Sequence, residues 1–467
     1  MKTLKALSIS FAAAAALAGT ASAQTVIHVA GSTAFRAPAT AAMIDYLNAN
    51  SSGRGVYAGY TGSSLLGAGN AILANGTIGA GGTATIEIET YWTGSLAGLV
   101  DLVTKNTVGT QYLDPSVIGT TAIAAINNSG TPNVTVGTAT NSSVYGGGVV
   151  ITPSAVANSF PDLTFSDSHK ATVQTELATA TLSAPIGTFT TIGQIASTVG
   201  GGTVVDSGSS TDAGNDVGAT ALSDGLVGVL GFQWAASKGA PAITNISQQA
   251  VKTLMNSGNI DASLLTGVSG SGVTFYLTGR NEDSGTRIDT FSEAQYGVTS
   301  APKQYQSNFT LFPANSTLNT EANISWAPAG HSGFASGSNV ATAVDSTTSG
   351  GTKYLIGALG ITDALTAQTG GATLLSYNGV PYSVANIQNG LYTLWAYEHA
   401  YHLSSLTGAV LTAANAIADN VHDTDADIAG NGKHSAVSGD VAAGILYDGN
   451  FNVFRPVTPE GGPITHF

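Results

Sequence analysis

The sequence predicts an α/β protein, because strand-like runs alternate with helix-like segments along the chain. The run 25–30 reads Thr-Val-Ile-His-Val-Ala, and within 83–92 apolar and acidic side chains alternate. Each run leads through a short turn containing Gly and Ser into a segment with apolar residues at helical spacing. This order is typical of a parallel sheet whose strands are connected by helices.

The remaining elements follow from apolar spacing. The continuous apolar run 226–234 predicts a strand buried on both faces. The last expected helix is closed by Gly297. In chain order we expect a strand at 25–30, a helix around 43–47, a strand at 83–92, a helix over 96–103, strands at 226–234 and 273–277 separated by a helix at 246–254, and a helix over 288–294.

Long stretches rich in Gly, Ala, Ser and Thr interrupt these elements. Only 9% of the 467 residues are charged, against about 25% in an average soluble protein, while 43% apolar residues suffice for a core. We expect residues 51–82 and 299–350 to lie outside the core, because their composition offers little apolar surface to offset chain ordering. Residues 414–444 are similar, and 105–158 is expected to be an elaboration.

The first 23 residues have the pattern of a secretory signal peptide. Lys2 and Lys5 precede the apolar run 6–17, and Ala21-Ser22-Ala23 forms a small-residue cleavage site before Gln24. No later run reaches the roughly 18 apolar residues that span a membrane, and without cysteine a disulfide or a cysteine lipid anchor cannot form. We therefore expect an exported, soluble mature chain in the periplasm or outside the cell, with no membrane insertion.

The charge balance excludes two classes of partner. The formal net charge is −14, and no run of Lys or Arg occurs. Nucleic acid and anionic membranes are therefore not expected to bind this surface. An anion that binds this protein must be held by local hydrogen bonds.

Three strand-to-helix junctions, 32–35, 94–95 and 284–286, carry hydroxyl residues and glycine. The first N–H groups of a helix are unpaired and its dipole makes that end positive, so each junction suits an oxyanion. Ser and Thr are also ordinary N-caps, which is the commoner role of any single junction. The third junction is more specific, because Arg280 lies four residues before Ser284 and can bind an oxyanion through two parallel hydrogen bonds.

Four segments resemble motifs of the periplasmic phosphate-binding proteins of phosphate ABC transporters. Residues 30–38, Ala-Gly-Ser-Thr-Ala-Phe-Arg-Ala-Pro, resemble the opening motif, which ends Thr-Phe-x-x-Pro. Residues 280–286, Arg-Asn-Glu-Asp-Ser-Gly-Thr, resemble the most specific motif, Arg-x-Asp-x-Ser-Gly-Thr. Residues 162–168 and 93–98 resemble the Ala-Ser-Asp segment and the Gly-Ser-x-Gly-Gly turn. Further similar segments, in the family's order, are 227–239, 244–258, 356–364 and 386–392.

The resemblance implies a two-lobed periplasmic-binding-protein fold of type II, here with Gly/Ser/Thr-rich insertions. Residues 24–237 plus 389–467 would form lobe 1 and residues 238–388 lobe 2, and the lobes would close on dehydrated phosphate. The implied partners are inorganic phosphate and a membrane ABC permease, without a cofactor or metal. The phosphate-binding residues that the resemblance implies are Ala34, Phe35, Ser95, Asp167, Arg280, Ser284, Gly285 and Thr286.

Asp167 has a distinct role within this set. An ionised carboxylate only accepts hydrogen bonds, so it favours a protonated phosphate oxygen and repels fully ionised sulfate.

The sequence departs from the family pattern at several positions. Ala34 stands where the family has Thr, so a hydroxyl donor is missing unless Ser32 or Thr33 replaces it. Glu282 stands where the family has Asp, which affects how the preceding arginine is oriented, and Leu96 replaces a small residue. A long stretch also separates the Gly-Ser turn from the Ala-Ser-Asp segment.

An alternative Gly-Ser turn occurs at Gly62-Ser63-Ser64. The strand expected before residue 93 favours Ser95 over Ser63 and Ser64.

Other chemical signals are weaker. Asp423, Asp425 and Asp427 alternate as in a calcium loop but lack its Gly and Glu, so a solvated acidic loop is expected. His399 and His402 beside Glu398 lack a third metal ligand, so we expect a helix-surface or interface role. No nucleophile elbow or Walker pattern occurs, so we expect a binding protein and not an enzyme.

The expected function is that of an exported solute-binding protein that binds inorganic phosphate for uptake by an ABC transporter. Two alternatives stay open: a binder of another oxyanion such as sulfate or molybdate, and an extracellular or cell-surface structural protein that kept the fold.

Overall fold

The computed structural model describes most of the residues of the chain. They are 24–79, 81–105, 112–115, 123–128, 145–151, 156–157, 159–208, 225–313, 324–325, 327–346, 351–426, 445–446, 451–455 and 460–466. The expected signal peptide and the cleavage site before Gln24 lie outside the described residues.

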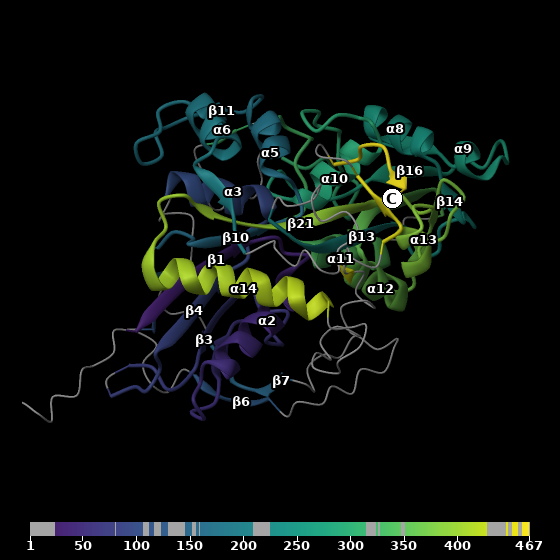
Figure 1. The fold of residues 1–467 in the computed structure, drawn as a ribbon. Helices are drawn as coiled ribbons and strands as arrows, with labels where there is room; N and C mark the ends of the chain where they lie inside the picture. The colour runs from purple at the N-terminus through teal and green to yellow at the C-terminus, as the bar shows by residue number, and fades with distance from the viewer. Residues whose placement is uncertain are drawn as a thin grey trace, which may run out of the picture.

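The strands and helices alternate as in an α/β protein (Figure 1). The strands are β1 (Thr25–Gly31), β2 (Tyr57–Tyr60), β3 (Asn70–Ala74), β4 (Ile86–Tyr91), β5 (Tyr112–Leu113), β6 (Ala124–Asn128), β7 (Tyr145–Gly147), β8 (Val149–Val150), β9 (Val156–Ala157), β10 (Leu163–Ser166), β11 (Thr181–Leu182), β12 (Val204–Asp206), β13 (Leu226–Ala236), β14 (Asn245–Ile246), β15 (Asn259–Asp261), β16 (Thr274–Leu277), β17 (Ile324–Ser325), β18 (Lys353–Gly360), β19 (Thr373–Leu374), β20 (Ser376–Tyr377), β21 (Trp395–Leu403), β22 (Ile445–Leu446), β23 (Val453–Phe454) and β24 (Thr465–His466). The helices are α2 (Arg36–Ala49), α3 (Ser95–Thr104), α5 (Lys170–Leu177), α6 (Ile192–Gly200), α8 (Gln248–Ser257), α9 (Ser263–Thr266), α10 (Gly285–Glu293), α11 (Gly337–Ser346), α12 (Ile361–Gly370), α13 (Val384–Gln388) and α14 (Gly408–Ala426).

A 16-stranded sheet organises the molecule, in the order β15-β16-β18-β13-β21-β10-β1-β4-β3-β2-β6-β7 with β8, β12, β19 and β22 attached. The long strand β13 joins its two parts. Residues 226–231 of β13 pair with β21, and residues 232–236 pair with β18. The α/β fold is thus built as two sheet regions on either side of β13.

Helices cover both faces of the region around β1. Helices α3, α5 and α6 lie above it in Figure 1, and α2 and α14 lie below it. In the other region, α11 and α12 pack on β18 and β13, while α8 contacts β15 and β16. Trp234 and Trp395 are among the largest fully buried side chains, so β13 and β21 lie at the centre of the core.

The direction of the strands places the junctions 32–35 and 94–95 at one edge together with Asp167. β1 is parallel to both β4 and β10, and the carboxyl ends of parallel strands meet at the same edge, where α/β proteins bind ligands. The chain leaves β1 at Ser32, β4 at Trp92 and β10 at Asp167. Segments far apart in the sequence are therefore neighbours.

The strands and helices expected at 25–30, 83–92, 96–103, 226–234, 246–254 and 273–277 are confirmed within a few residues at their ends. The helix expected over 288–294 begins earlier, at Gly285.

The expectation that residues 51–82 lie outside the core is wrong. β2 and β3 are strands of the main sheet, and β3 pairs antiparallel with β4. Ile72 and Leu73 are fully buried. Composition did not predict this short buried segment, because Gly, Ala and Ser surround its few large apolar residues.

Two further stretches also differ from expectation. Within 299–350, helix α11 packs Val340 and Val344 into a core cluster against β18. Within 414–444, residues up to 426 belong to α14, which buries Ala414 and Ile417. Alanine has the highest helix propensity, so an Ala-rich segment forms a helix readily.

Candidate functional site

The starts of α3 and α10 meet at the sheet edge. The backbone N–H of Leu96 donates to the carbonyl oxygen of Asp283 at 3.1 Å, and that of Gly94 donates to Gly31 at 2.9 Å. Gly94 has a φ of 116°, and a Cβ there would lie 2.4 Å from the Asp283 oxygen. Only glycine allows this close approach. The Gly-Ser turn and the Ser-Gly-Thr motif therefore form one surface.

Asp167 lies at the centre of this surface. The Ser95 hydroxyl donates to Oδ1 of Asp167, and the Thr286 hydroxyl donates to Oδ2 at 3.4 Å. The backbone N–H of Asp167 donates to the Ser95 oxygen at 3.3 Å. Asp167 is 1% exposed. Three predicted site residues from three segments are thus in direct contact.

Gly285 allows the carboxylate to rest on the first turn of α10. A Cβ at position 285 would lie 1.6 Å from Oδ1 of Asp167. The carboxylate therefore lies against the end of the helix where unpaired N–H groups and the helix dipole favour negative charge.

The three junctions are not capped in the ordinary way. Helices α2, α3 and α10 begin without a side-chain cap hydrogen bond. Side chains cap α5, α6, α8 and α13, whereas α9 and α12 also begin without such a bond. Ser284 precedes α10 and is 2% exposed, yet its hydroxyl has no hydrogen-bond partner among the described residues. The interpretation of these residues as plain N-caps therefore does not fit.

Arg280 is buried beside this surface. Main-chain carbonyl oxygens orient it, and not the acid two residues later that the family pattern implies. Its Nε donates to the carbonyl oxygen of Phe334 at 3.2 Å, and its Nη2 to that of Ala335 at 2.9 Å. Its Nη1 donates to the Thr33 hydroxyl at 3.1 Å, which links it to the first junction. These bonds use three of the five N–H donors of a guanidinium.

The electrostatics of the site are dominated by buried acids. Burial raises the pKa of Asp167 to about 6, although the Ser95 hydrogen bond and the charge of Arg280 lower it. Burial also raises the pKa of Asp283 and Asp289 well above the usual range. Protons are therefore readily retained in this part of the molecule.

The departures from the family pattern have structural explanations. Glu282 does not hydrogen-bond Arg280; its Oε2 accepts from the Ser332 hydroxyl at 2.9 Å. Leu96 is fully buried in the cluster formed with α5 and α6. Ser63 is exposed, whereas Ser95 contacts Asp167, which favours Ser95 as the residue of the turn.

The remaining predicted residues, Ala34 and Phe35, lie at the first junction. The Phe35 ring is buried and packs at 5.7 Å from that of Phe165. The Ala34 Cβ would be 3.9 Å from a Cβ on Gly360. Neither side chain supplies a polar group, so this junction offers only main-chain atoms and the hydroxyls of Ser32 and Thr33.

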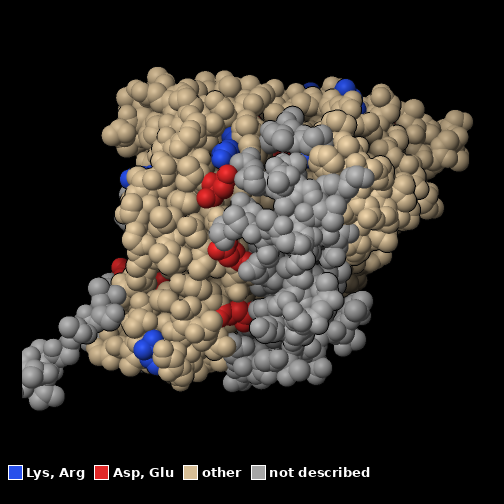
Figure 2. Space-filling model, viewed as in Figure 1, with Lys and Arg blue, Asp and Glu red and all other residues tan. Residues whose placement is uncertain are grey.

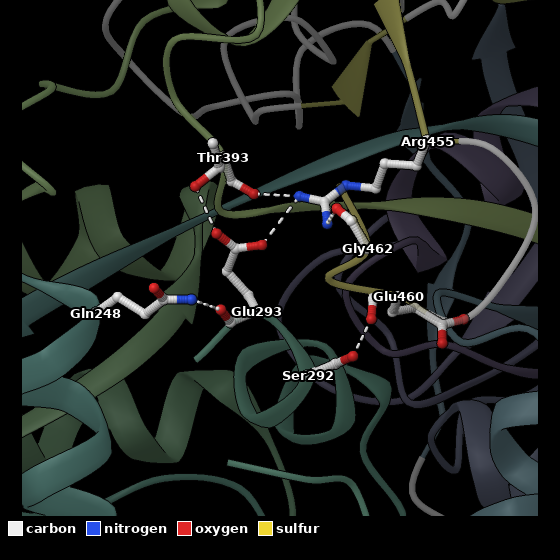
Figure 3. A network of polar contacts seen from close by, with 7 residues as sticks. All are labelled: Gln248, Ser292, Glu293, Thr393, Arg455, Glu460 and Gly462. Atoms are coloured by element: carbon white, nitrogen blue, oxygen red, sulfur yellow. Dashed lines mark hydrogen bonds and ion pairs between the residues drawn. The ribbon is translucent and has the colours of Figure 1, made fainter. Parts of the chain in front are cut away.

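The C-terminal segment secures α10, which sequence reasoning missed because the partners are far apart in the chain (Figure 3). Arg455 Nη2 lies 3.1 Å from Glu293 Oε2 and also donates to the Thr393 carbonyl oxygen. The carbonyl oxygen of Glu460 accepts from the Ser292 hydroxyl.

The side chain of Glu460 secures a second helix. Its carboxylate accepts from the backbone N–H of His169 and from the Thr172 hydroxyl, at the start of α5. One short segment thus connects α5 with α10.

The two histidines weighed as metal ligands lie in a different element from the one expected. His399 and His402 lie on strand β21 and not on a helix, so their expected helix-surface role is wrong. His402 Nδ1 lies 2.7 Å from the Ser207 hydroxyl, and the His399 ring stacks on Tyr401.

The acidic run expected as a loop is helical at Asp423 and Asp425, while Asp427 lies outside the described residues.

The described residues contain neither a membrane-spanning helix nor a cluster of metal ligands. No helix there is long and apolar enough to cross a bilayer, and no group of three or more metal-ligating side chains gathers there. On the face in Figure 2, the described surface shows scattered charged groups and no broad basic area.

Solved structures similar in fold to this chain include several phosphate-binding proteins. An ABC-type phosphate transport receptor from Vibrio cholerae is 11% identical, with a TM-score of 0.39, over 90% of this chain and 99% of that one. A phosphate-binding protein from Stenotrophomonas maltophilia is 14% identical, with a TM-score of 0.38, over 91% and 92%. PstS from Borrelia burgdorferi is 10% identical, with a TM-score of 0.34, over 91% and 99%.

No family model and no curated protein sequence matches this chain. Identities and TM-scores this low leave its ligand to be argued from its own residues.

Proposed function

We propose that this protein is an exported, non-enzymatic solute-binding protein that binds inorganic phosphate at Asp167 and delivers it to a membrane ABC permease. The observation that carries the proposal is the position of the Asp167 carboxylate. Donors from two motif segments, Ser95 and Thr286, converge on its oxygens at the start of α10. The same arrangement of hydroxyls and helix N–H groups suits the oxygens of an oxyanion.

Phosphate fits this arrangement better than sulfate. Asp167 can accept a hydrogen bond from a ligand that carries a proton, and at neutral pH phosphate retains one while sulfate does not. In our proposal the carboxylate moves off Gly285 when phosphate binds, and the donors of α3 and α10 then bond to the ligand. Arg280, held at its rear by Phe334 and Ala335, offers its remaining N–H groups.

The test is calorimetric titration of the purified mature chain with phosphate and with sulfate at pH 7.5. We expect saturable phosphate binding and much weaker sulfate binding.

Equal binding of both anions would favour a general oxyanion binder. Binding of neither would contradict the proposal and favour an extracellular structural role.

A further inference from the structure

Glu398 is a buried acid next to the site, and the function proposed above gives it no role. It lies on β21, which pairs antiparallel with β10 through Phe165–Ala400 and Ser166–His399. One further step along this register brings Asp167 beside Glu398. On the other side Glu398 pairs with Gly228, which has no side chain to cover it. Glu398 therefore lies directly beside Asp167, at the end of β10.

Neither carboxyl oxygen of Glu398 has a hydrogen-bond partner among the described residues, although the residue is 0% exposed. Ser32 follows β1 on the opposite side of β10, and its buried hydroxyl is also without a partner among those residues. Leaving a buried polar group unpaired is costly, so these two groups at the same edge are suited to pair with each other and with a ligand.

The two groups are close to each other. Burial raises the pKa of Glu398 well above its usual range, the charge of Asp167 raises it further, and the Ser32 hydroxyl lowers it. Asp289 on α10 also faces this cluster, and its own pKa is raised. Burial therefore favours the protonated, neutral form of Glu398, in which its O–H can donate to the Ser32 oxygen.

We propose that Ser32 and Glu398 form a second polar wall of the oxyanion site, in which the Ser32 hydroxyl donates to the ligand the hydrogen bond that Ala34 cannot. This inference rests on the proposed function. Glu398 acts as a positioning residue, because its O–H donates to the Ser32 oxygen and so leaves the serine hydrogen free for the ligand. The wall adds a donor without adding positive charge.

The test measures phosphate binding by calorimetry at pH 7.5 for the full mature chain and four variants. Ser32→Ala should weaken binding about tenfold, as expected for one lost hydrogen bond. Glu398→Leu should weaken it similarly, whereas Glu398→Gln keeps an N–H donor of the same shape and should bind within about threefold of wild type. The double variant Ser32→Ala/Glu398→Leu should bind no worse than Ser32→Ala, because Glu398 acts through the serine.

Glu87→Gln is the matched control. It removes a buried acid near the start of β4, at the edge of the sheet opposite the site, where Glu87 pairs with Val26, and should bind like wild type. If wild type binds phosphate and Ser32→Ala binds equally well, the inference is overturned and the proposed function stands. If wild type binds no phosphate, both fail.

Discussion

At the scale of single residues, the site depends on placing a carboxylate where the chain also concentrates donors. Asp167 accepts from Ser95 and Thr286, and burial holds its pKa at about 6. Because its folded pKa is above its unfolded value, the ligand-free protein loses stability as pH rises from about 4 to about 6. A ligand that shares a proton with Asp167 recovers part of the stability that is lost when the buried carboxyl group ionises.

Asp167→Asn tests that role. Asparagine keeps the shape but removes the charge that repels sulfate, so we expect phosphate binding to weaken about tenfold while sulfate binding increases. Titrations with both anions at pH 7.5 measure the ratio of the phosphate affinity to the sulfate affinity. An unchanged preference for phosphate would show that Asp167 does not set selectivity.

Arg280→Ala tests the buried cation of the site. Removing a charged partner from a dehydrated site costs about 2–5 kcal/mol of binding free energy, so phosphate binding should be nearly lost. Arg54→Ala is the control, because Arg54 bonds to Asn75 and Thr85 in another part of the sheet. The carry-over of Arg280 from the family motif is wrong if both variants bind phosphate like wild type.

At the scale of elements, α10 is fixed by the C-terminal segment. Arg455 and Glu293 form a buried ion pair, and the Arg455 guanidinium also lies over the Trp395 ring at 4.4 Å. Breaking such a pair from one side leaves a buried charge and typically costs about 3–5 kcal/mol.

Arg455→Met should therefore lower the free energy of unfolding by about 3 kcal/mol at pH 8. The loss should be smaller at pH 5, because the unpaired Glu293 can then take up a proton. Arg455→Met/Glu293→Gln should recover most of the stability. Urea unfolding at both pH values measures these differences, and a double variant no more stable than Arg455→Met would contradict the pairing.

His28 ties β1 to its neighbours. Its Nε2 lies 3.5 Å from Glu89 on β4, and its Nδ1 lies 3.2 Å from Asp162. Burial lowers the pKa of His28, but the hydrogen bonds to Asp162 and Glu89 outweigh it and raise the pKa to about 9.

A raised histidine pKa stabilises the fold fully below about 6.5, and this stability is lost as pH rises through about 9. Wild type should lose about 2–3 kcal/mol more than His28→Gln between pH 6.5 and 9.5. Burial raises the pKa of nearby Glu87 to about 7 and the charge of His28 lowers it, so Glu87 titrates in both proteins but at a higher pH in His28→Gln. Parallel pH profiles in urea unfolding would refute the assignment.

At the scale of the whole molecule, the sequence predicted what local patterns encode. Strong alternation at 83–92 predicted β4, which leads into Ser95, and the apolar run at 226–234 predicted β13. Matching motifs assigned Ser95 and Asp167, 72 residues apart, to one site, and the structure places them in direct contact. The strands β2 and β3 were missed because their few apolar residues lie among glycines.

Long-range polar pairs could not be predicted. Glu398 is adjacent to Asp167 only through the register of β10 and β21, and no local pattern fixes that register. Glu460 reaches the start of α5 from 291 residues away. The assignment of residues 24–237 with 389–467 and 238–388 to two lobes stays a prediction, with β13 as the strand that joins the two sheet regions.

The most direct test of the central claim is a crystal structure of the mature chain grown with saturating phosphate. We expect one phosphate at the carboxyl edge of β1 and β10, bonded to Ser95, Asp167, Arg280 and the 284–286 turn. Density for phosphate elsewhere, with the Asp167 carboxylate still resting on Gly285, would contradict the account.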